Sequence, residues 1–203
     1  MVKKMTAEFS EQAHCPVPVW GCVLIGGKST RMGSPKHLLR REGVTWLELI
    51  VRQLQGQVEQ VVLVGRGEIP HSLARLQVVA DVPGLKGPLA GVLAAFRQQP
   101  KVSWLVSACD LPCLESAALE WLLGCRRSGV RAVLPDLAGD GQVEPLLAYY
   151  DCSCRNFLEE LAAAGLHKLS GLVGRPGVIT PQPPAHLHGS WRNLNCPEDV
   201  ESL

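Results

Sequence analysis

Apolar and polar positions follow two alternating patterns along most of the chain. Short uninterrupted apolar runs, some of which stop at glycine, are typical of strands buried on both faces of a parallel sheet. Between these runs lie segments whose apolar residues have the spacing of one helix face. The predicted strands are residues 19–25, 60–64, 76–80, 102–108 and 131–134, and the predicted helices are residues 45–55, 88–96, 116–125 and 154–164.

This alternation predicts an α/β fold with a doubly wound, mostly parallel sheet that carries helices on both faces. A chain of 203 residues is long enough for one domain with a substantial core. The pattern changes after residue 135, where a loop rich in glycine and aspartate follows at residues 137–142. We expect residues 143–150 to pair with a neighbouring strand as a hairpin, and a proline-rich stretch follows at residues 175–184.

Composition and charge narrow the function classes. Hydrophobic residues make up 46% of the sequence and charged residues 19%, a balance typical of a globular protein. The formal net charge of +1 gives no electrostatic footprint for a nucleic acid or an anionic membrane. No apolar run reaches the length of a membrane span, and residues 1–18 lack the apolar stretch of a secretory signal. We therefore expect a cytoplasmic protein, with residues 1–18 as a flexible lead-in to a domain over residues 19–203.

The sequence contains eight cysteines, but they form no pair of CxxC knuckles. This spacing favours reduced structural thiols over a zinc site or a disulfide framework. The one closely spaced pair is Cys152 and Cys154.

Polar residues gather after three of the predicted strands, in residues 26–36, 81–91 and 109–112. Ligands of open parallel sheets bind outside the carboxyl ends of the strands. We therefore expect the three segments to converge on one site.

The first of these segments has the chemistry of a phosphate-binding loop. Gly26 and Gly27 follow a strand, where the absence of a Cβ lets backbone N–H groups approach a polyphosphate or a base edge. Lys28, Arg31 and Lys36 add the positive charge that a triphosphate requires. The segment is not a Walker A loop, which needs GxxxxGK[ST], and its glycines do not have the Rossmann spacing. A glycine-rich surface turn with solvated cations is the alternative interpretation.

Carboxylates mark the other two segments. Asp110 ends a buried strand, where an ionised carboxylate is costly unless a cation or hydrogen-bond donors meet it. Asp81 precedes Gly87 and Pro88, which predict a helix N-terminus with unpaired N–H groups available to an anion. Taken alone, Asp81 is equally compatible with a simple turn residue.

Together these segments resemble the motifs of a known group of enzymes. GGKSTRMGSPK at residues 26–36, GPLAG at residues 87–91 and CDLP at residues 109–112 resemble the nucleotidyltransferases of molybdenum cofactor synthesis, above all the molybdenum cofactor guanylyltransferase (MobA) family. The closing residues 193–199 resemble the family's N-x-N-T-P-E-D, and we expect Asn195 there to cap a last helix. The resemblance implies a single domain with a Rossmann-like nucleotidyltransferase fold.

The resemblance also assigns roles to individual residues. It implies Mg²⁺ as the cofactor, with Asp110 as its ligand, and catalytic roles for Arg31, Lys36 and Asp110. The nucleotide-binding residues that it implies are Leu24, Ile25, Gly26, Gly27, Ser29, Lys36, Asp81 and Asp110.

The implied reaction transfers GMP from GTP to the phosphate of molybdenum-bearing molybdopterin, giving the guanine dinucleotide cofactor and pyrophosphate. GTP is favoured because CTP users of this superfamily tend to have Ala-Gly where this chain has Gly26-Gly27. The resemblance further implies transient contact with molybdenum-enzyme assembly factors. The alternatives are a molybdopterin cytidylyltransferase or another small-molecule nucleotidyltransferase.

Two departures from the family pattern support an alternative of another class, a non-catalytic GTP-binding accessory protein. Pro35 stands where the family usually has aspartate before the lysine. An asparagine that contacts the nucleotide in the family is replaced around Gly65 and Arg66. A shared fold and binding loop do not by themselves establish turnover.

Overall fold

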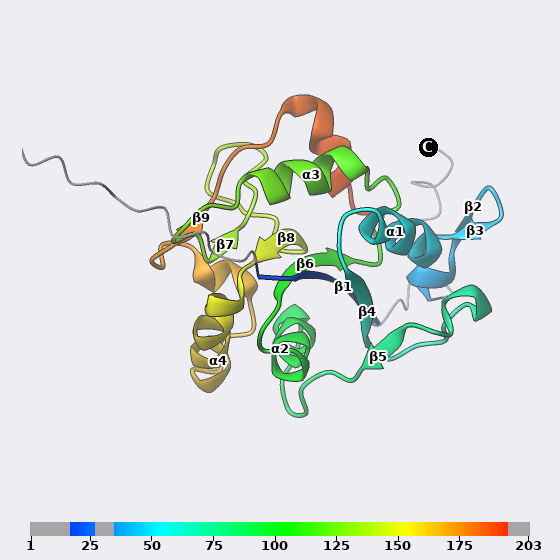
Figure 1. Cartoon of the computed structure of the whole chain (residues 1–203), viewed down its shortest axis with the longest axis horizontal. Coiled ribbons are helices and arrows are strands. Elements are labelled where there is room, and N and C mark those ends of the chain that lie inside the picture. The colour runs from blue at the N-terminus through cyan, green and yellow to red at the C-terminus, as the bar shows by residue number, and fades with distance from the viewer. Residues whose placement is uncertain (1–16, 27–34, 195–203) are drawn as a thin grey trace, which may run out of the picture.

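A central sheet runs through the computed structural model, which describes residues 17–26 and 35–194 (Figure 1). Within these residues the sheet has seven strands in the order β5-β4-β1-β6-β8-β7-β9. Strand β8 is antiparallel to its neighbours β6 and β7, and the other pairs are parallel. The prediction of a mostly parallel sheet is confirmed. The strands are β1 (Val19–Ile25), β4 (Gln60–Gly65), β5 (Gln77–Val79), β6 (Ser103–Ala108), β7 (Ala132–Val133), β8 (Leu147–Tyr150) and β9 (Val178–Ile179).

Helices cover both faces of the sheet, which confirms the doubly wound arrangement. Figure 1 shows α1 (Trp46–Gln55) and α3 (Ser116–Gly124) on one face and α2 (Pro88–Gln98) and α4 (Arg155–Ala163) on the other. Each face has its own hydrophobic core, one formed with α1 and α3 and the other with α2 and α4. The chain therefore folds as a single α/β domain of three layers.

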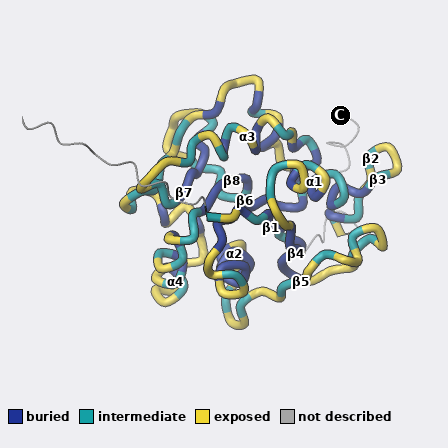
Figure 2. Tube along the Cα trace, viewed as in Figure 1, coloured by how far each residue is buried: buried dark blue, intermediate teal, exposed yellow. Residues whose placement is uncertain are grey.

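Strand β1 shows how the apolar runs produce two cores. Val23 and Ile25 pack into the core of α1 and α3, whereas Cys22 packs into the core of α2 and α4. Successive side chains of a strand point to opposite faces, and here both faces are covered. This is why the strand is an uninterrupted apolar run rather than an alternation. In Figure 2 the buried part of the trace follows the central strands, and the exposed parts lie at the periphery.

Helix α1 begins at a capping box. The Oγ1 of Thr45 accepts a hydrogen bond from the backbone N–H of Glu48 at 3.2 Å, and the Glu48 carboxylate accepts one from the backbone N–H of Thr45 at 2.8 Å. The Ser72 hydroxyl also donates to Glu48. The hydrogen bond from Ser72, followed by those from Thr45, lowers the pKa of Glu48 to about 2. The carboxylate of the capping box is therefore ionised at neutral pH.

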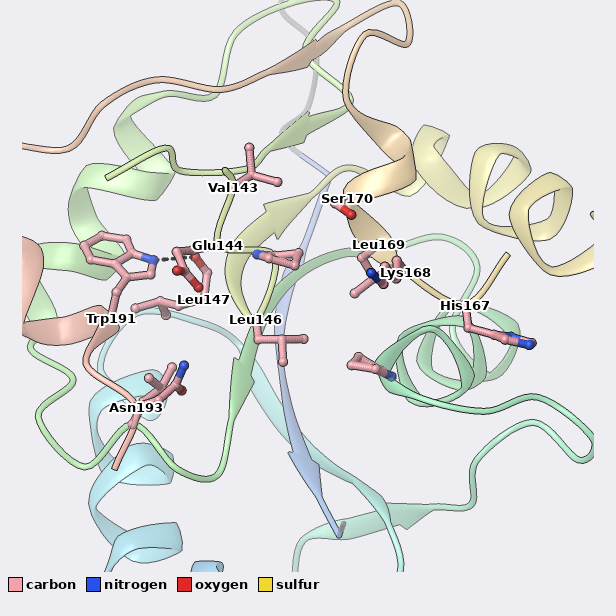
Figure 3. Close-up of a pocket in the computed structure, with 13 residues that line it drawn as sticks. Val143, Glu144, Leu146, Leu147, His167, Lys168, Leu169, Ser170, Trp191 and Asn193 are labelled. Carbon is pink, nitrogen blue, oxygen red and sulfur yellow. Dashed lines mark hydrogen bonds between the residues drawn. The ribbon is translucent and has the colours of Figure 1, made fainter. Parts of the chain in front are cut away.

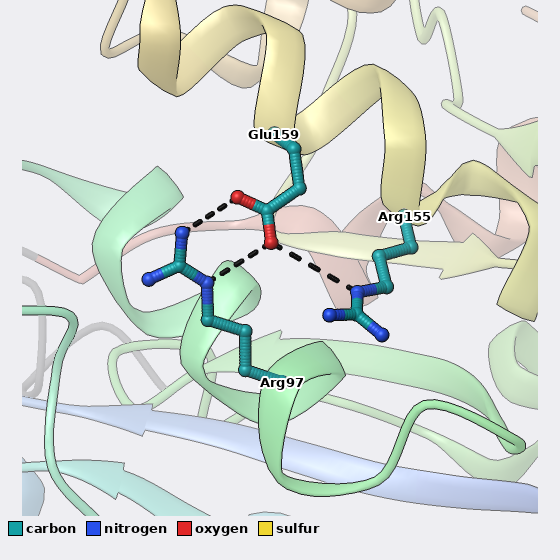
Figure 4. A network of polar contacts seen from close by, with 3 residues as sticks. All are labelled: Arg97, Arg155 and Glu159. Carbon is teal, nitrogen blue, oxygen red and sulfur yellow. Dashed lines mark hydrogen bonds and ion pairs between the residues drawn. The ribbon is translucent and has the colours of Figure 1, made fainter.

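An ion-pair network joins α2 and α4 at the surface (Figure 4). Arg97 donates hydrogen bonds to both carboxylate oxygens of Glu159 at 2.6 and 3.0 Å, and Arg155 lies 3.9 Å from the same carboxylate. The network is solvent-exposed, so each pair contributes at most about 1 kcal/mol to stability. It supports the packing of two helices on one face of the sheet.

The predicted strands and helices occur in the predicted order, with ends displaced by at most two residues. The hairpin expected for residues 143–150 is also confirmed, since β8 pairs with β7 and a bridge joins Asp136 to Val143. The sequence pattern does not predict the hairpin of β2 (Arg40–Arg41) and β3 (Val44–Thr45), or β9 within the proline-rich segment. These strands have two residues each, which is too short for a periodic signal. The remaining described elements are the 3₁₀ turns η1 (Lys36–Leu38), η2 (His71–Leu73), η3 (Cys152–Cys154), η4 (Leu169–Leu172) and η5 (Ala185–Trp191).

Some sequence predictions fall outside the described residues. They concern most of the lead-in over residues 1–18, and the cap expected at Asn195. Among the helices of residues 17–26 and 35–194, none has the length and apolar character needed to span a bilayer.

Candidate functional site

A cavity of about 490 Å³ lies at the carboxyl ends of β1 and β6, and we call it the larger cavity. Residues 24–26 line it from the end of β1 and residues 108–110 from the end of β6, while Asp81 follows β5 and Lys36 belongs to η1. The chain leaves β1 for β4 on one side and returns to β6 on the other. Such a switch point opens a crevice where ligands of open α/β sheets bind. Described residues from each of the three polar segments that were expected to converge line this cavity.

Glycine backbones form the junction between β1 and β4 beside this cavity. Gly65 has a φ of +120°, and a Cβ at this position would lie 1.8 Å from the carbonyl oxygen of Ile25. Gly26 has a φ of +109°, which also favours glycine. A side chain is therefore excluded at position 65. This position lies in the region where the chain departs from the pattern that it resembles.

Lys36 and Asp110 form an ion pair within the larger cavity. The Nζ of Lys36 lies 3.3 Å from the Oδ2 of Asp110, and their side chains are 19% and 22% exposed. The pair joins η1 to the end of β6 across 74 positions of sequence. The sequence showed that Asp110 needed a positive partner, and the structure supplies one from the glycine-rich loop. Both charges remain accessible to a ligand that enters the cavity.

His37 fixes the turn that carries Lys36. Its side chain is 3% exposed, and its Nε2 lies 2.8 Å from the carbonyl oxygen of Glu68 in the loop after β4. A Cβ on Gly67 would come within 2.8 Å of the His37 ring, so glycine is needed there for this contact. No sequence pattern indicates this role of His37, because its partner is a backbone carbonyl distant in the chain.

Helix α2 begins at the larger cavity. Gly87 is its N-cap residue with a φ of +71°, and Pro88 is its first residue. The N-terminus of a helix presents unpaired N–H groups and partial positive charge. One turn later, a Cβ on Gly91 would lie 2.7 Å from the Leu24 side chain and 3.2 Å from the Asp81 carboxylate. Glycine at this position lets Asp81 approach the first turn of α2.

Cys109 also lines the larger cavity but is unsuited to nucleophilic chemistry. Burial, assisted by the negative charge of Asp110, raises the pKa of Cys109 to about 12. The thiol is therefore protonated at neutral pH. The cysteines of the described residues are free thiols, and Cys152 and Cys154 are not bonded to each other.

A second cavity of about 260 Å³, here called the smaller cavity, adjoins the first (Figure 3). Pro88 and Leu146 line both cavities. Figure 3 shows that its walls come from the segment before and within β8, from η4 and from the end of η5. Trp191 closes one side and donates a hydrogen bond from Nε1 to the carbonyl oxygen of Leu147 at 3.0 Å. Glu144, Lys168 and Asn193 are among its polar lining residues.

The structure brings most of the sequence-predicted site residues together, although their functional roles stay predictions. Gly27, Ser29 and Arg31 lie outside the described residues. Sequence reasoning did not identify Leu146 or the greater part of the smaller cavity, since neither lies in a motif. The residues that meet at the larger cavity as expected are Leu24, Ile25, Gly26, Lys36, Asp81 and Asp110.

Asp110 is the candidate ligand for a divalent cation. Within residues 17–26 and 35–194, no cluster of three or more His, Cys, Asp or Glu side chains could hold a metal ion by itself. Mg²⁺ commonly takes one or two carboxylates and completes its shell with phosphate oxygens and water. An accessible Asp110 beside Lys36 fits this pattern, since a bound triphosphate would bring the remaining oxygens.

Comparison with known proteins agrees with this geometry. The model of the MobA-like NTP transferase domain matches residues 21–176. A probable molybdenum cofactor guanylyltransferase from Halalkalibacterium halodurans is 28% identical over 89% of this chain and 94% of its own. Another from Bacillus cytotoxicus is 31% identical over 65% of this chain and 68% of its own.

The fold is also similar to solved structures. The crystal structure of molybdopterin-guanine dinucleotide biosynthesis protein A from Archaeoglobus fulgidus has a TM-score of 0.72 and 26% sequence identity. The match covers 90% of this chain and 95% of that chain. The likeness therefore extends beyond the glycine-rich loop to nearly the whole domain.

Proposed function

The chain belongs to the MobA-like NTP transferase family, and we propose that this nucleotidyltransferase moves GMP from GTP to the phosphate of a molybdopterin. The products are the guanine dinucleotide form of the cofactor and pyrophosphate. The observation that carries the proposal is the pairing of Lys36 with Asp110 in a cavity that adjoins a second one. Similarity to proteins named as molybdenum cofactor guanylyltransferases supports the choice of substrates.

The two cavities suit the two substrates. The larger one offers glycine backbone, the start of α2 and Lys36 to a nucleoside triphosphate. The smaller one offers apolar walls and a few polar groups to the acceptor. Asp110 lines the larger cavity and its chain neighbour Leu111 lines the smaller. The phosphates of both substrates would therefore meet at the carboxyl end of β6.

The proposed reaction is an in-line displacement at the α-phosphorus of GTP. An oxygen of the acceptor phosphate forms a new P–O bond, and the bond from the α-phosphorus to the oxygen bridging toward the β-phosphate breaks. Pyrophosphate leaves with that electron pair. Because the acceptor phosphate is already an anion, no strong general base is required. Lys36 orients the phosphates and stabilises the developing charge. Arg31 is predicted to stabilise the same charge.

We propose Mg²⁺ as the cofactor, with Asp110 as its protein ligand. Bound there, the ion would neutralise negative charge on the phosphates. Asp110 would hold and orient the cation, and Lys36 would then be available to contact the phosphates. The cytoplasmic location and the transient contact with molybdenum-enzyme assembly factors stay predictions.

The test is a calorimetric titration of the purified protein with GTP and then CTP, each with and without Mg²⁺. Magnesium-dependent binding of GTP in preference to CTP is the expected result. A preference for CTP would instead indicate the cytidylyltransferase alternative. Tight GTP binding without pyrophosphate release in the presence of the acceptor would indicate the non-catalytic alternative.

A further inference from the structure

The smaller cavity has a carboxylate with an unusual position. Glu144 precedes β8 in the chain, lines this cavity and is half-buried. Its backbone N–H donates to the carbonyl oxygen of Pro135 at 2.7 Å, and the next residue, Pro145, accepts a hydrogen bond from the Tyr150 hydroxyl at 2.8 Å. The base of the Glu144 side chain is therefore anchored on both sides.

The carboxylate itself has no partner within residues 17–26 and 35–194. No cation lies within ion-pair distance of Glu144, and no protein group there donates a hydrogen bond to its side chain. Burial raises the pKa of Glu144. Partial removal from water disfavours the ionised carboxylate unless donors meet it. A ligand that supplies N–H donors would remove that cost.

The neighbouring groups indicate what kind of ligand fits. Leu111, Leu147 and the buried Trp191 give the cavity apolar walls, which suit a flat ring system. The smaller cavity adjoins the larger one, which Asp110 lines, at the shared residues Pro88 and Leu146. A ligand with a phosphate at Asp110 would therefore place its ring in the smaller cavity, within reach of Glu144.

We propose that Glu144 is a specificity-determining residue, which recognises the amino-pyrimidinone edge of the acceptor's heterocycle. This inference rests on the proposed function, since a pterin acceptor carries that edge. The ring N3–H and the 2-amino N–H lie side by side and match the two oxygens of one carboxylate. This recognition requires no residue of the larger cavity. Glu144 therefore selects the acceptor independently of the nucleotide.

The experiment compares two phosphorylated pteridines that differ at one position. One probe is 6-hydroxymethylpterin monophosphate, and the other is the corresponding lumazine, in which an oxygen replaces the 2-amino group. Fluorescence titration measures the Kd of each with the wild-type chain and with Glu144→Gln. We expect the wild type to bind the pterin at least about tenfold more tightly, because the lumazine loses a charge-assisted hydrogen bond and sets oxygen against oxygen.

Glu144→Gln should reverse this preference. Its amide can accept from N3–H and donate to the 2-oxo group, so the lumazine becomes the better match. The control is Glu59→Gln, an exposed carboxylate before β4 at the opposite end of the strands, which should keep the wild-type preference. An unchanged pterin preference in Glu144→Gln would overturn the inference, as would a wild type that binds neither probe or both equally.

GTP binding is measured in parallel. This measurement separates a failure of the role of Glu144 from a failure of the proposed function. Both variants should bind GTP with Mg²⁺ as the wild type does. GTP binding together with an unchanged pteridine preference contradicts the role of Glu144 alone. Absence of GTP binding in the wild type contradicts the proposed function itself.

Discussion

The two cavities of this domain are built in different ways. The larger cavity lies where parallel strands end, and most of the residues that line it occur in three short segments recognisable in the sequence. The smaller cavity is assembled from an antiparallel strand region and two 3₁₀ turns. Glycines and charged residues are prominent in the lining of the larger cavity. The smaller cavity has apolar walls with a few polar groups. The difference indicates that the proposed phosphate site is encoded by local motifs, whereas the proposed acceptor site depends on tertiary packing.

The largest expected effect comes from removing the charge at the centre of the larger cavity. Asp110→Ala should lower turnover roughly 100- to 1000-fold at saturating Mg²⁺, because the cation loses its protein ligand. Pyrophosphate release with GTP and acceptor measures it. Asp140→Ala, in the exposed loop before β8, is the matched control and should keep full activity. A wild-type rate in Asp110→Ala would remove Asp110 from the mechanism.

A smaller effect should follow from adding one methyl group to the larger cavity. In Gly91→Ala the new Cβ meets the Leu24 side chain and the Asp81 carboxylate at 2.7 and 3.2 Å. Displacing them should raise the Kd for GTP about tenfold, with pteridine binding unchanged. Gly124→Ala is the control, because a Cβ at that helix position meets nothing within 4 Å. Equal losses of GTP and pteridine affinity would contradict the separation of the two cavities.

The converse experiment changes the smaller cavity alone. Trp191→Phe removes the 3.0 Å hydrogen bond to the Leu147 carbonyl and part of the apolar wall. We expect an increase of about fivefold in the acceptor KM, corresponding to roughly 1 kcal/mol, while the KM for GTP stays constant. Steady-state kinetics with GTP and acceptor varied in turn measure both constants. A change confined to the GTP side would show that the cavities are wrongly assigned.

A substitution in the capping box of α1 should affect stability and neither cavity. Glu48→Gln should lower the free energy of unfolding by about 1 kcal/mol at neutral pH and leave both affinities unchanged. The pKa of Glu48 is lowered from 4.5 to about 2, so its stabilising contribution is present above pH 4.5 and is lost as the pH falls toward 2. Denaturant unfolding across this range should show the two proteins converging. A constant difference at all pH values would exclude an ionised Glu48 as the cause.

The sequence by itself determined the order of strands and helices and the three polar segments of the larger cavity. Uninterrupted apolar runs and helical spacing depend on burial and local geometry. They can therefore be recognised in the sequence without knowing which segments pack against each other. Lys36 and Asp110 were identifiable because each lies in a motif after a strand.

Only the tertiary structure decided which distant residues meet. The contact of His37 with the Glu68 carbonyl joins two loops through a backbone atom, which leaves no pattern in the side chains. The placement of Glu144 in the smaller cavity depends on β8 entering the sheet antiparallel to β6. Strand pairing between distant segments is set by the packing of the whole sheet, because short strands with similar apolar side chains fit more than one neighbour.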